Sequence, residues 1–319
     1  PLLAGRVPGH RPDHRAVRPV ARDGAARHRR GVLVSDDTQM TLAVAEALAE
    51  AAAAGPLTAD RLAGPLRDRF LAWWRSPDND RAPGATCLRA CEPLSDGRPW
   101  QAASRTGSKG CGANMRVAPV ALVPGLDPAT RSAAARLQAA LTHGHPTALA
   151  AADLTAHAVR LLADGIDPAG LVPALREHAA ASRTVYHAAW LGDLAARAGA
   201  GDPAAYLARG WDECLAALDR LEAALAAPGL EADPCLAAGA GWTAEEALAT
   251  GLYCFLPLPG DPLAAVRRAA CSSGDSASIA ALTGAFAGAH HGAAAWPREW
   301  TERLEYRDRL LALAAAWDR

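Results

Sequence analysis

The sequence contains few of the residues from which β-sheets are built. Only 5% of its 319 residues are aromatic. Segments rich in Val, Ile, Tyr and Phe, which favour strands, are almost absent. Half of the residues are hydrophobic, and much of that half is alanine, the strongest helix former. The composition therefore predicts an all-α protein with a substantial core.

Features of membrane and secreted proteins are also missing. No apolar run is long enough to span a bilayer, and no charged segment followed by an apolar one opens the chain. The net charge is −1, so the protein as a whole is not basic enough to bind nucleic acid or membranes by electrostatics. Its seven cysteines are scattered, and Cys87 and Cys91 have no second pair, which favours free thiols over zinc. We expect a cytoplasmic protein with no membrane partner and no nucleic acid.

The first 30 residues differ from the rest of the chain. They contain eight Arg against two Asp, mixed with Pro, Gly and His, and they follow no helical or strand period. We expect residues 1–30 to be irregular or disordered. Residues 31–319 show no break in composition and no fixed-period repeat, so one domain is expected there.

Apolar residues recur at helical spacing from residue 36 onward, and Thr58 is expected to cap a helix that reaches Trp74. Gly and Pro mark the ends of most of the later helices. The region 76–113 is rich in Pro, Gly, Ser and Asp, and we expect a long functional loop there. Further helices are expected at about 129–141, 146–163, 167–180, 203–226, 243–256, 261–271, 277–290 and 298–317.

The stretch "SDDT", Ser35 to Thr38, places Asp36 and Asp37 directly before an apolar helical pattern. A helix cap explains one carboxylate, because its oxygen accepts backbone N–H bonds and its charge suits the helix dipole. It explains two less well, because adjacent carboxylates repel each other unless a cation lies between them. Four oxygen-bearing side chains in a row suit a hard cation such as Mg²⁺. Both interpretations, capping and metal binding, remain open at this point.

A second acidic helix start lies in "CSSGDSASIAALTGAFAGAHHG", residues 271–292. Asp275 precedes this helix among several hydroxyls, and we expect it to meet the first helix start and to share a metal with it. The alternative is a capped core helix. Gly284 and Gly288 lie one turn apart, and their lack of a side chain is expected to let another helix approach closely.

Two loops carry polar groups that suit a phosphate or a sugar. In "TGSKGCGANMR", three glycines expose backbone N–H groups beside Lys109 and Arg116, which suits phosphate binding. The spacing is not that of a P-loop, and a glycine-rich turn before a helix is the alternative. In "LTHGHPTAL", His143 precedes a helix and is placed to hydrogen-bond a sugar hydroxyl, although a loop histidine is more often a surface or capping residue.

Taken together, these segments resemble the ADP-ribosylglycohydrolase family, the relatives of dinitrogenase-reductase-activating glycohydrolase. The resemblance rests on "SDDTQMTLAVAEAL", "GSKGCGANMRVAPVAL", "THGHPTALAAA" and "GWTAEEALATGLYCFL…GDSASIAALTGAFAGAHHG", with a similar tail "WPREWTERLE". It covers roughly residues 32–310. It implies a single orthogonal multi-helix all-α domain with a di-metal cleft that holds two Mg²⁺ ions. It also implies hydrolysis of the N- or O-glycosidic bond between ADP-ribose and a modified protein or small molecule.

The resemblance implies a role for each matching residue. It assigns Ser35, Asp36, Asp37, Asp275 and Ser278 as metal ligands, with Asp36 or Asp37 doubling as the catalytic base. It assigns Gly107, Ser108, Lys109 and Gly110 to the diphosphate and nearby ribose, and His143 to the wall of the ADP-ribose cleft.

Two departures from the family pattern bear on activity. The second acidic motif normally reads Gly-Asp-Ser/Thr-Asp-Ser/Thr, but Ala277 stands in place of its second aspartate. A methyl group cannot bind a metal ion, so at least one metal site is expected to be weakened. Residues 1–30 also lack the family's Gly-Asp-Ala-x-Gly helix, so we expect a truncated or divergent N-terminus that leaves the helix at 38–52 short of a packing partner.

Three functions follow from these observations. The first is a Mg²⁺-dependent ADP-ribosyl hydrolase, impaired by Ala277 and the atypical N-terminus. The second is a catalytically weakened relative that binds ADP-ribose or an ADP-ribosylated partner. The third is a metal-free helical scaffold whose carboxylates only cap helices.

Overall fold

The computed structural model describes residues 32–318. The expectation of an irregular segment at residues 1–30 therefore lies outside the described residues. Across residues 32–318 every regular element is a helix, and β-pairing is limited to the isolated bridges Val32–Leu304 and Gly110–Thr243. The all-α prediction is confirmed. None of the helices in this range is both long and apolar enough to cross a bilayer.

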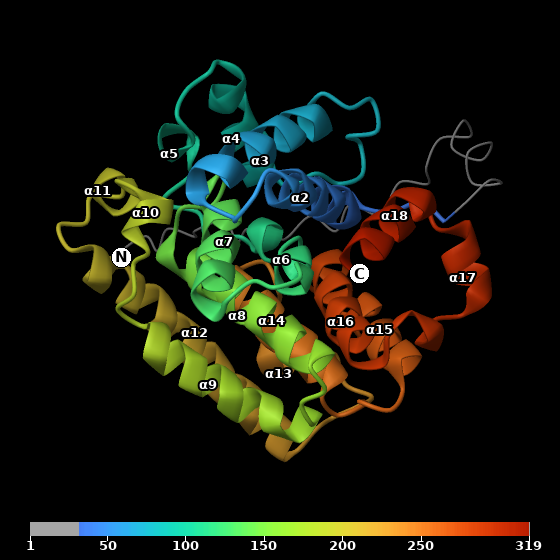
Figure 1. Cartoon of the computed structure of the whole chain (residues 1–319). Helices are drawn as coiled ribbons and strands as arrows, with labels where there is room; N and C mark the ends of the chain where they lie inside the picture. The colour runs from blue at the N-terminus through green and yellow to red at the C-terminus, as the bar shows by residue number, and fades with distance from the viewer. Residues whose placement is uncertain (1–31, 319) are drawn as a thin grey trace, which may run out of the picture.

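The helices follow one another with short connections (Figure 1). The α-helices are α2 (Asp36–Ala53), α3 (Ala59–Trp74), α4 (Ala85–Ser95), α5 (Trp100–Ala103), α6 (Ala118–Leu122), α7 (Pro128–Ala140), α8 (Pro146–Ala163), α9 (Leu171–Ser182), α10 (Ala188–Leu191), α11 (Leu194–Arg197), α12 (Pro203–Ala226), α13 (Cys235–Ala238), α14 (Ala244–Phe255), α15 (Pro262–Ala270), α16 (Ser276–His291), α17 (Arg298–Arg303) and α18 (Arg307–Trp317). The 3-10 helices are η1 (Cys111–Ala113), η2 (Pro168–Gly170) and η3 (Ala293–Ala295).

Helix α8 lies at the centre of the core and is buried along most of its length. Its alanine-rich surface lets α7, α12 and α14 pack against it. Figure 1 shows α9 and α12 running beside α8 and α14. At Gly210 of α12, an added Cβ would lie 2.2 Å from the carbonyl carbon of Pro146. The long α12 thus crosses the start of α8 at backbone contact, which only glycine permits.

The close helix approach expected at Gly284 and Gly288 is not present. A Cβ added at Gly284 would lie 3.9 Å from Val266, and one at Gly288 would lie 3.8 Å from Trp296, which is ordinary van der Waals contact. The close approach to α16 is instead made by Gly251 of α14, where a Cβ would lie 3.1 Å from Cβ of Leu282. The prediction placed the tight glycine contact on α16, whereas it lies on α14. The spacing of two glycines in a sequence does not show which face of their helix a neighbouring helix packs against.

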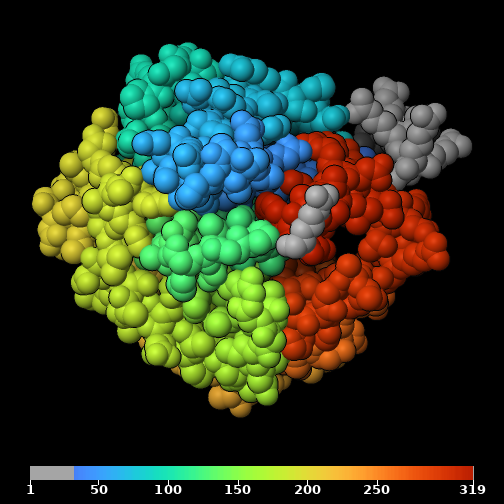
Figure 2. All heavy atoms as spheres, in the orientation of Figure 1, coloured from blue at the N-terminus to red at the C-terminus, as the bar shows by residue number. Residues whose placement is uncertain are grey.

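Helix α2 does not lack packing partners, contrary to the sequence-based expectation. Its apolar face, Met40, Val44 and Leu48, is fully buried, and α3, α6, α16 and α18 lie against it. In Figure 2 the blue N-terminal helices touch the red C-terminal segment directly. The C-terminal helices thus occupy space that we expected to be left open.

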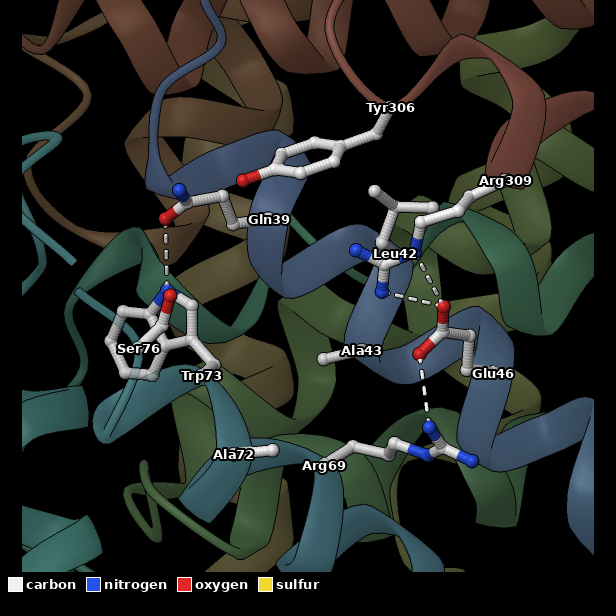
Figure 3. A pocket seen from close by; sticks show the side chains of 10 residues that line it. All are labelled: Gln39, Leu42, Ala43, Glu46, Arg69, Ala72, Trp73, Ser76, Tyr306 and Arg309. Carbon is white, nitrogen blue, oxygen red and sulfur yellow. Dashed lines mark hydrogen bonds and ion pairs between the residues drawn. The ribbon is translucent and has the colours of Figure 1, made fainter. Parts of the chain in front are cut away.

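The solvent side of α2 is held by a separate polar cluster around a small cavity of about 220 Å³ (Figure 3). Trp73 of α3 donates its indole N–H to Oε1 of Gln39, with an N–O distance of 3.2 Å. The Glu46 carboxylate pairs with Arg69 at 3.3 Å and with Arg309 at 2.6 Å. These contacts fix α2 between α3 and α18, and so they fix the orientation of its N-terminal residues.

Two other expectations were wrong in part. The region 76–113 is not one long loop, because it contains α4 and α5. Cys87, Cys91 and Leu94 form an apolar face of α4 that is buried against the core, and this burial outweighs the proline at position 93. The helix expected at 298–317 is divided into α17 and α18, because Tyr306 takes a left-handed conformation with φ of 60°.

Candidate functional site

The two adjacent carboxylates at the start of α2 do not cap that helix. Ser35 occupies the N-cap position but makes no side-chain cap bond. Its hydroxyl donates to Oδ2 of Asp37 at 2.7 Å, and Oδ2 of Asp36 accepts the backbone N–H of Gly84 at 3.1 Å. Within the described chain, the buried Oδ1 of Asp37 has no hydrogen-bond partner. Helix capping therefore does not explain why these side chains are held there.

The second acidic start is positioned by a close backbone contact. A Cβ added at Gly274 would lie 1.9 Å from the carbonyl oxygen of Ala240, and the same oxygen accepts the N–H of Asp275 at 2.8 Å. Oδ1 of Asp275 then accepts the N–H of Ser278 at 3.2 Å and caps α16. Glycine is thus required immediately before the carboxylate, and Asp275 combines a capping role with a place in the site.

The two helix starts face one cavity of about 390 Å³. This volume lies within the range of small-molecule sites. Its lining brings together four of the five residues expected to bind metal and two of the five expected to bind substrate. The lining residues are Asp36, Asp37, Ala82, Gly84, Ala85, Thr86, Gly110, Cys111, Gly112, Met115, His143, Trp242, Asp275, Ala277 and Ser278.

The carboxylates in this cavity repel one another. Burial, followed by the charge of Asp37, raises the pKa of Asp36 to about 7, and Asp275 adds to the effect. Burial also raises the pKa of Asp37, and the charge of Asp275 acts in the same direction. Carboxylates that share a buried site repel one another, so they can all be ionised only when a cation lies among them; otherwise at least one keeps its proton. The electrostatics therefore favour a positive ligand.

The donors are hard oxygen atoms, one of them unpartnered, and they fit a divalent cation. They are not yet converged, since among residues 32–318 no group of three or more His, Cys, Asp and Glu side chains forms a ready metal cage. The bonds from Ser35 and from the N–H of Gly84 each occupy a carboxylate oxygen. Binding a cation would require these side chains to rotate away from their present donors.

Cys111 is a cavity residue that the sequence analysis did not single out. Its thiol donates to Oδ2 of Asp275 at 2.9 Å and lies 3.4 Å from Oγ of Ser278. Burial, and then the charge of Asp275, raise the pKa of the thiol well above its ordinary value, so it keeps its proton in the free protein. The one available signal was its place between Gly110 and Gly112 in the glycine-rich loop.

His143 lies on the cavity wall, as expected, and it is almost fully buried. Its Nδ1 lies 2.8 Å from the hydroxyl of Thr142. Burial and the nearby Arg116 lower its pKa to about 3, so the imidazole is neutral at pH 7. A neutral imidazole can donate one hydrogen bond and accept another, which suits a sugar hydroxyl.

The loop before Cys111 reaches the cavity only in part. Gly110 lines it, whereas Gly107, Ser108 and Lys109 do not. The hydroxyl of Ser108 lies 2.9 Å from that of Thr86, a lining residue. Lys109, the only lysine in the sequence, pairs with Glu213 at 2.7 Å and with Glu245 at 2.6 Å. Its charge is therefore already balanced, and a role for this loop at a diphosphate stays a prediction.

Trp242 forms part of the cavity wall and was also missed. Its side chain is 62% exposed, although its carbonyl oxygen is fixed by the N–H of Cys111 at 3.1 Å. An exposed indole beside a polar cavity offers a flat surface on which a base can stack. The sequence signal was an aromatic residue in the glycine-rich segment "GAGWT".

An all-α domain whose cavity brings together carboxylates with raised pKa values from two distant helix starts has the features by which a candidate active site is recognised. A family model described as ADP-ribosylglycohydrolase matches residues 5–319, and the chain belongs to that family. The match extends beyond the segment covered by the sequence motifs. The family resemblance stated from those motifs is confirmed.

Solved structures give the same result. The chain is similar to one described as "ADP-ribosylglycohydrolase-related protein complex", with 25% identity and a TM-score of 0.61. The similarity covers 89% of this chain and 80% of that one. No curated protein sequence matches the chain. The family supports a glycohydrolase-type activity on ADP-ribosylated substrates.

Proposed function

We propose that this chain is a divalent-metal-dependent hydrolase that removes ADP-ribose from a modified protein or small molecule. The observation that supports the proposal is that Asp36, Asp37 and Asp275 all line one cavity, where the buried Oδ1 of Asp37 has no hydrogen-bond partner in the described chain. Ser35 and Ser278 lie beside these carboxylates and would complete an oxygen donor set. Taken alone, oxygen donors of this kind suit a hard divalent cation such as Mg²⁺.

A bound Mg²⁺ would supply the positive charge that orients ribose hydroxyls and activates water. The chain's own groups would perform the remaining tasks. Asp36 or Asp37 would accept the proton of the water that attacks the anomeric carbon. The electron pair of the broken glycosidic bond would go to the leaving nitrogen or oxygen of the target, which takes up a proton from that carboxyl group or from solvent. Neutral His143 would hydrogen-bond a ribose hydroxyl, and the indole of Trp242 would face the base or the ring system at the cavity mouth.

Ala277 limits this activity. Its side chain lines the cavity at the position where the family pattern has a carboxylate. Three carboxylates then face the four positive charges that two Mg²⁺ ions bring. Because two such ions lie about 3.5–4 Å apart and need anionic bridges, we propose that only one is held firmly.

The second candidate function is binding of ADP-ribose or an ADP-ribosylated partner without turnover. Ala277 is the observation that favours it, because loss of one metal can abolish chemistry while the cavity still accepts its ligand. Calorimetry with ADP-ribose and Mg²⁺ reports binding, and an assay for released ADP-ribose reports turnover. Binding without release would select this second function.

The experiment that tests the proposal measures ADP-ribose released from arginine- and serine-linked ADP-ribosyl peptides, with and without Mg²⁺. Asp37→Asn is expected to abolish release. Asp60→Asn is the matched control, because Asp60 is an exposed carboxylate in the first turn of α3, outside the cavity. The proposed function would be wrong if Asp37→Asn left the release of ADP-ribose unchanged. It would also be wrong if the unaltered protein neither released nor bound ADP-ribose.

A further inference from the structure

The cavity contains a sulfur donor that a site built only for Mg²⁺ does not use. Sγ of Cys111 lies 2.9 Å from Oδ2 of Asp275, and both residues line the cavity. Mg²⁺ prefers oxygen ligands, whereas Zn²⁺ and Co²⁺ bind thiolate and carboxylate together. The donor set is therefore chemically mixed.

A buried carboxylate oxygen without a hydrogen-bond partner is the second observation that points to a ligand in this cavity. Asp37 is 3% exposed, lines the same cavity, and has a buried Oδ1 without a hydrogen-bond partner in the described chain. A buried carboxylate oxygen without a donor is costly unless a ligand completes it. The unpartnered atom and the thiol come from two different chain segments, α2 and the start of η1, and both residues line this cavity.

The geometry of the thiol and Asp275 needs little change to hold one ion. With a Zn–S bond of about 2.3 Å and a Zn–O bond of about 2.0 Å, tetrahedral ligands place sulfur and oxygen about 3.5 Å apart. The present S–O distance is 2.9 Å. The two atoms would therefore separate by about 0.6 Å as the hydrogen bond is replaced, which is a side-chain adjustment rather than a backbone movement.

Charge leads to the same conclusion. Ala277 leaves the cavity one carboxylate short of the family pattern. On binding, the thiol would release its proton to solvent and the sulfur would enter as an anion, because a metal-coordinated thiol is deprotonated. The sulfur would then supply the negative charge that position 277 lacks.

We propose that Cys111 is a metal ligand that, with Asp275, makes this cavity selective for a thiophilic divalent cation such as Zn²⁺ or Co²⁺ over Mg²⁺. The inference rests on the proposed function only for the role of the cavity. It concerns which ion is held, and it stands whether or not the loaded protein turns over substrate.

The test uses Co²⁺ alone as the probe on the full chain carrying Cys271→Ser, which removes an exposed thiol. A thiolate–Co²⁺ charge-transfer band that saturates at one equivalent is expected. Adding Cys111→Ser should remove the band, and adding Cys214→Ser, a buried thiol outside the cavity, should keep it. In calorimetric competition, Mg²⁺ should displace Co²⁺ from the Cys111→Ser protein at a concentration at least about tenfold lower than from the protein that retains Cys111.

Two outcomes would overturn the inference: no band in the folded Cys271→Ser protein, or a band that persists without Cys111. Thermal unfolding followed by circular dichroism shows whether each variant is folded. If Cys111→Ser does not fold, Asp275→Asn replaces it, with Asp60→Asn as the matched control, and the band must disappear only in the former. A missing band with intact Mg²⁺-dependent ADP-ribose release rejects this inference alone, whereas a band without release rejects only the proposed function.

Discussion

The thiol of Cys111 donates a hydrogen bond of 2.9 Å to Asp275, across 164 positions of the chain. Asp275 is thereby held from two directions, by the cap bond to its own helix and by the loop that leads into η1. The loop in turn is fixed by the N–H of Cys111, which donates to Trp242 at 3.1 Å. The Asp275 carboxylate, the Cys111 thiol and the backbone of Trp242 are thus linked by hydrogen bonds, and a change at any of them should alter the cavity.

Restoring the missing carboxylate should strengthen metal binding. Ala277 is exposed to the cavity, so Ala277→Asp can be accommodated without displacing core side chains. A carboxylate about 4 Å from a cation is worth up to about 4 kcal/mol before desolvation is subtracted. We expect Mg²⁺ affinity by calorimetry to rise at least about tenfold, with faster ADP-ribose release. Ala294→Asp adds the same charge at an exposed position outside the cavity and should change neither; equal responses would refute the missing-ligand account.

Removing the indole at the cavity mouth should weaken binding of the adenine-containing ligand. A stacked base contributes about 1–3 kcal/mol, so Trp242→Ala should weaken ADP-ribose binding about 5- to 150-fold. Trp300→Ala is the control, because Trp300 is also partly exposed but lies on α17, away from the cavity. Calorimetry with ADP-ribose and with ribose 5-phosphate separates the stacking contribution, since only the first ligand has a base. Equal losses for both ligands would contradict stacking.

A methyl group at Gly274 should damage both stability and the site. The added Cβ would meet the carbonyl oxygen of Ala240 at 1.9 Å, so the backbone must shift away from the bond that holds Asp275. Gly274→Ala should lower the free energy of unfolding by about 1–3 kcal/mol and also weaken metal binding. Gly284→Ala, inside α16 where the nearest atom is at 3.9 Å, should instead stabilise the protein by about 0.5–1 kcal/mol. Urea unfolding of the two variants measures the contrast, and similar effects would show that position 274 has no special constraint.

A buried ion pair far from the cavity should govern stability at low pH. Asp153 and Arg136 are both almost fully buried, with a contact of 2.7 Å. Although burial alone would raise it, the pKa of Asp153 is held well below its ordinary value of 3.8, chiefly by Arg136 and His178. The folded state therefore binds fewer protons there than the unfolded state. This contribution is fully present above pH 3.8 and is lost as the pH falls below it.

Asp153→Asn should thus cost about 3–5 kcal/mol at pH 7, because it leaves Arg136 buried without its counter-charge. The cost should shrink as the pH is lowered below the ordinary value for an aspartate. Asp212→Asn breaks an exposed pair with Arg183 and should cost less than about 1 kcal/mol. Urea unfolding at pH 7 and at pH values below 4 distinguishes the two variants. A cost for Asp153→Asn that does not depend on pH would contradict the assigned protonation.

Much of the fold could be predicted because local signals agree with the tertiary structure. The bounds of α8 and α12 were predicted correctly, since Pro146 and Pro203 stand at their first positions behind capping residues. Helix α4 was missed because Pro93 inside it and Pro83 and Pro99 on either side outweighed a short apolar face, and only burial against α3 reveals that face. Local sequence patterns thus predict helices that have capping residues and prolines at their ends. They fail for a helix such as α4, which is stabilised mainly by packing against the core.

In the candidate site, too, some contacts could be predicted from the sequence and others could not. The meeting of Asp36 and Asp275 was predicted, because both motifs carry recognisable acidic helix starts. The contact of Cys111 with Asp275 could not be predicted, since it depends on how a glycine-rich loop is threaded beside α14 and α16. The ion pairs of Lys109 were hidden for the same reason: Glu213 and Glu245 lie more than a hundred residues away, on other helices.

The order in which the chain is synthesised has a consequence for this site. The N–H of Val34, just before Asp36 and Asp37, donates to Glu305 at 3.0 Å across 271 positions, and Arg81 pairs with the same carboxylate at 2.9 Å. On the ribosome, the first acidic helix start emerges long before the residue that anchors it. The cavity can therefore reach its final form only after Glu305 has emerged, and a nascent chain paused before Glu305 would leave both aspartates without this anchor.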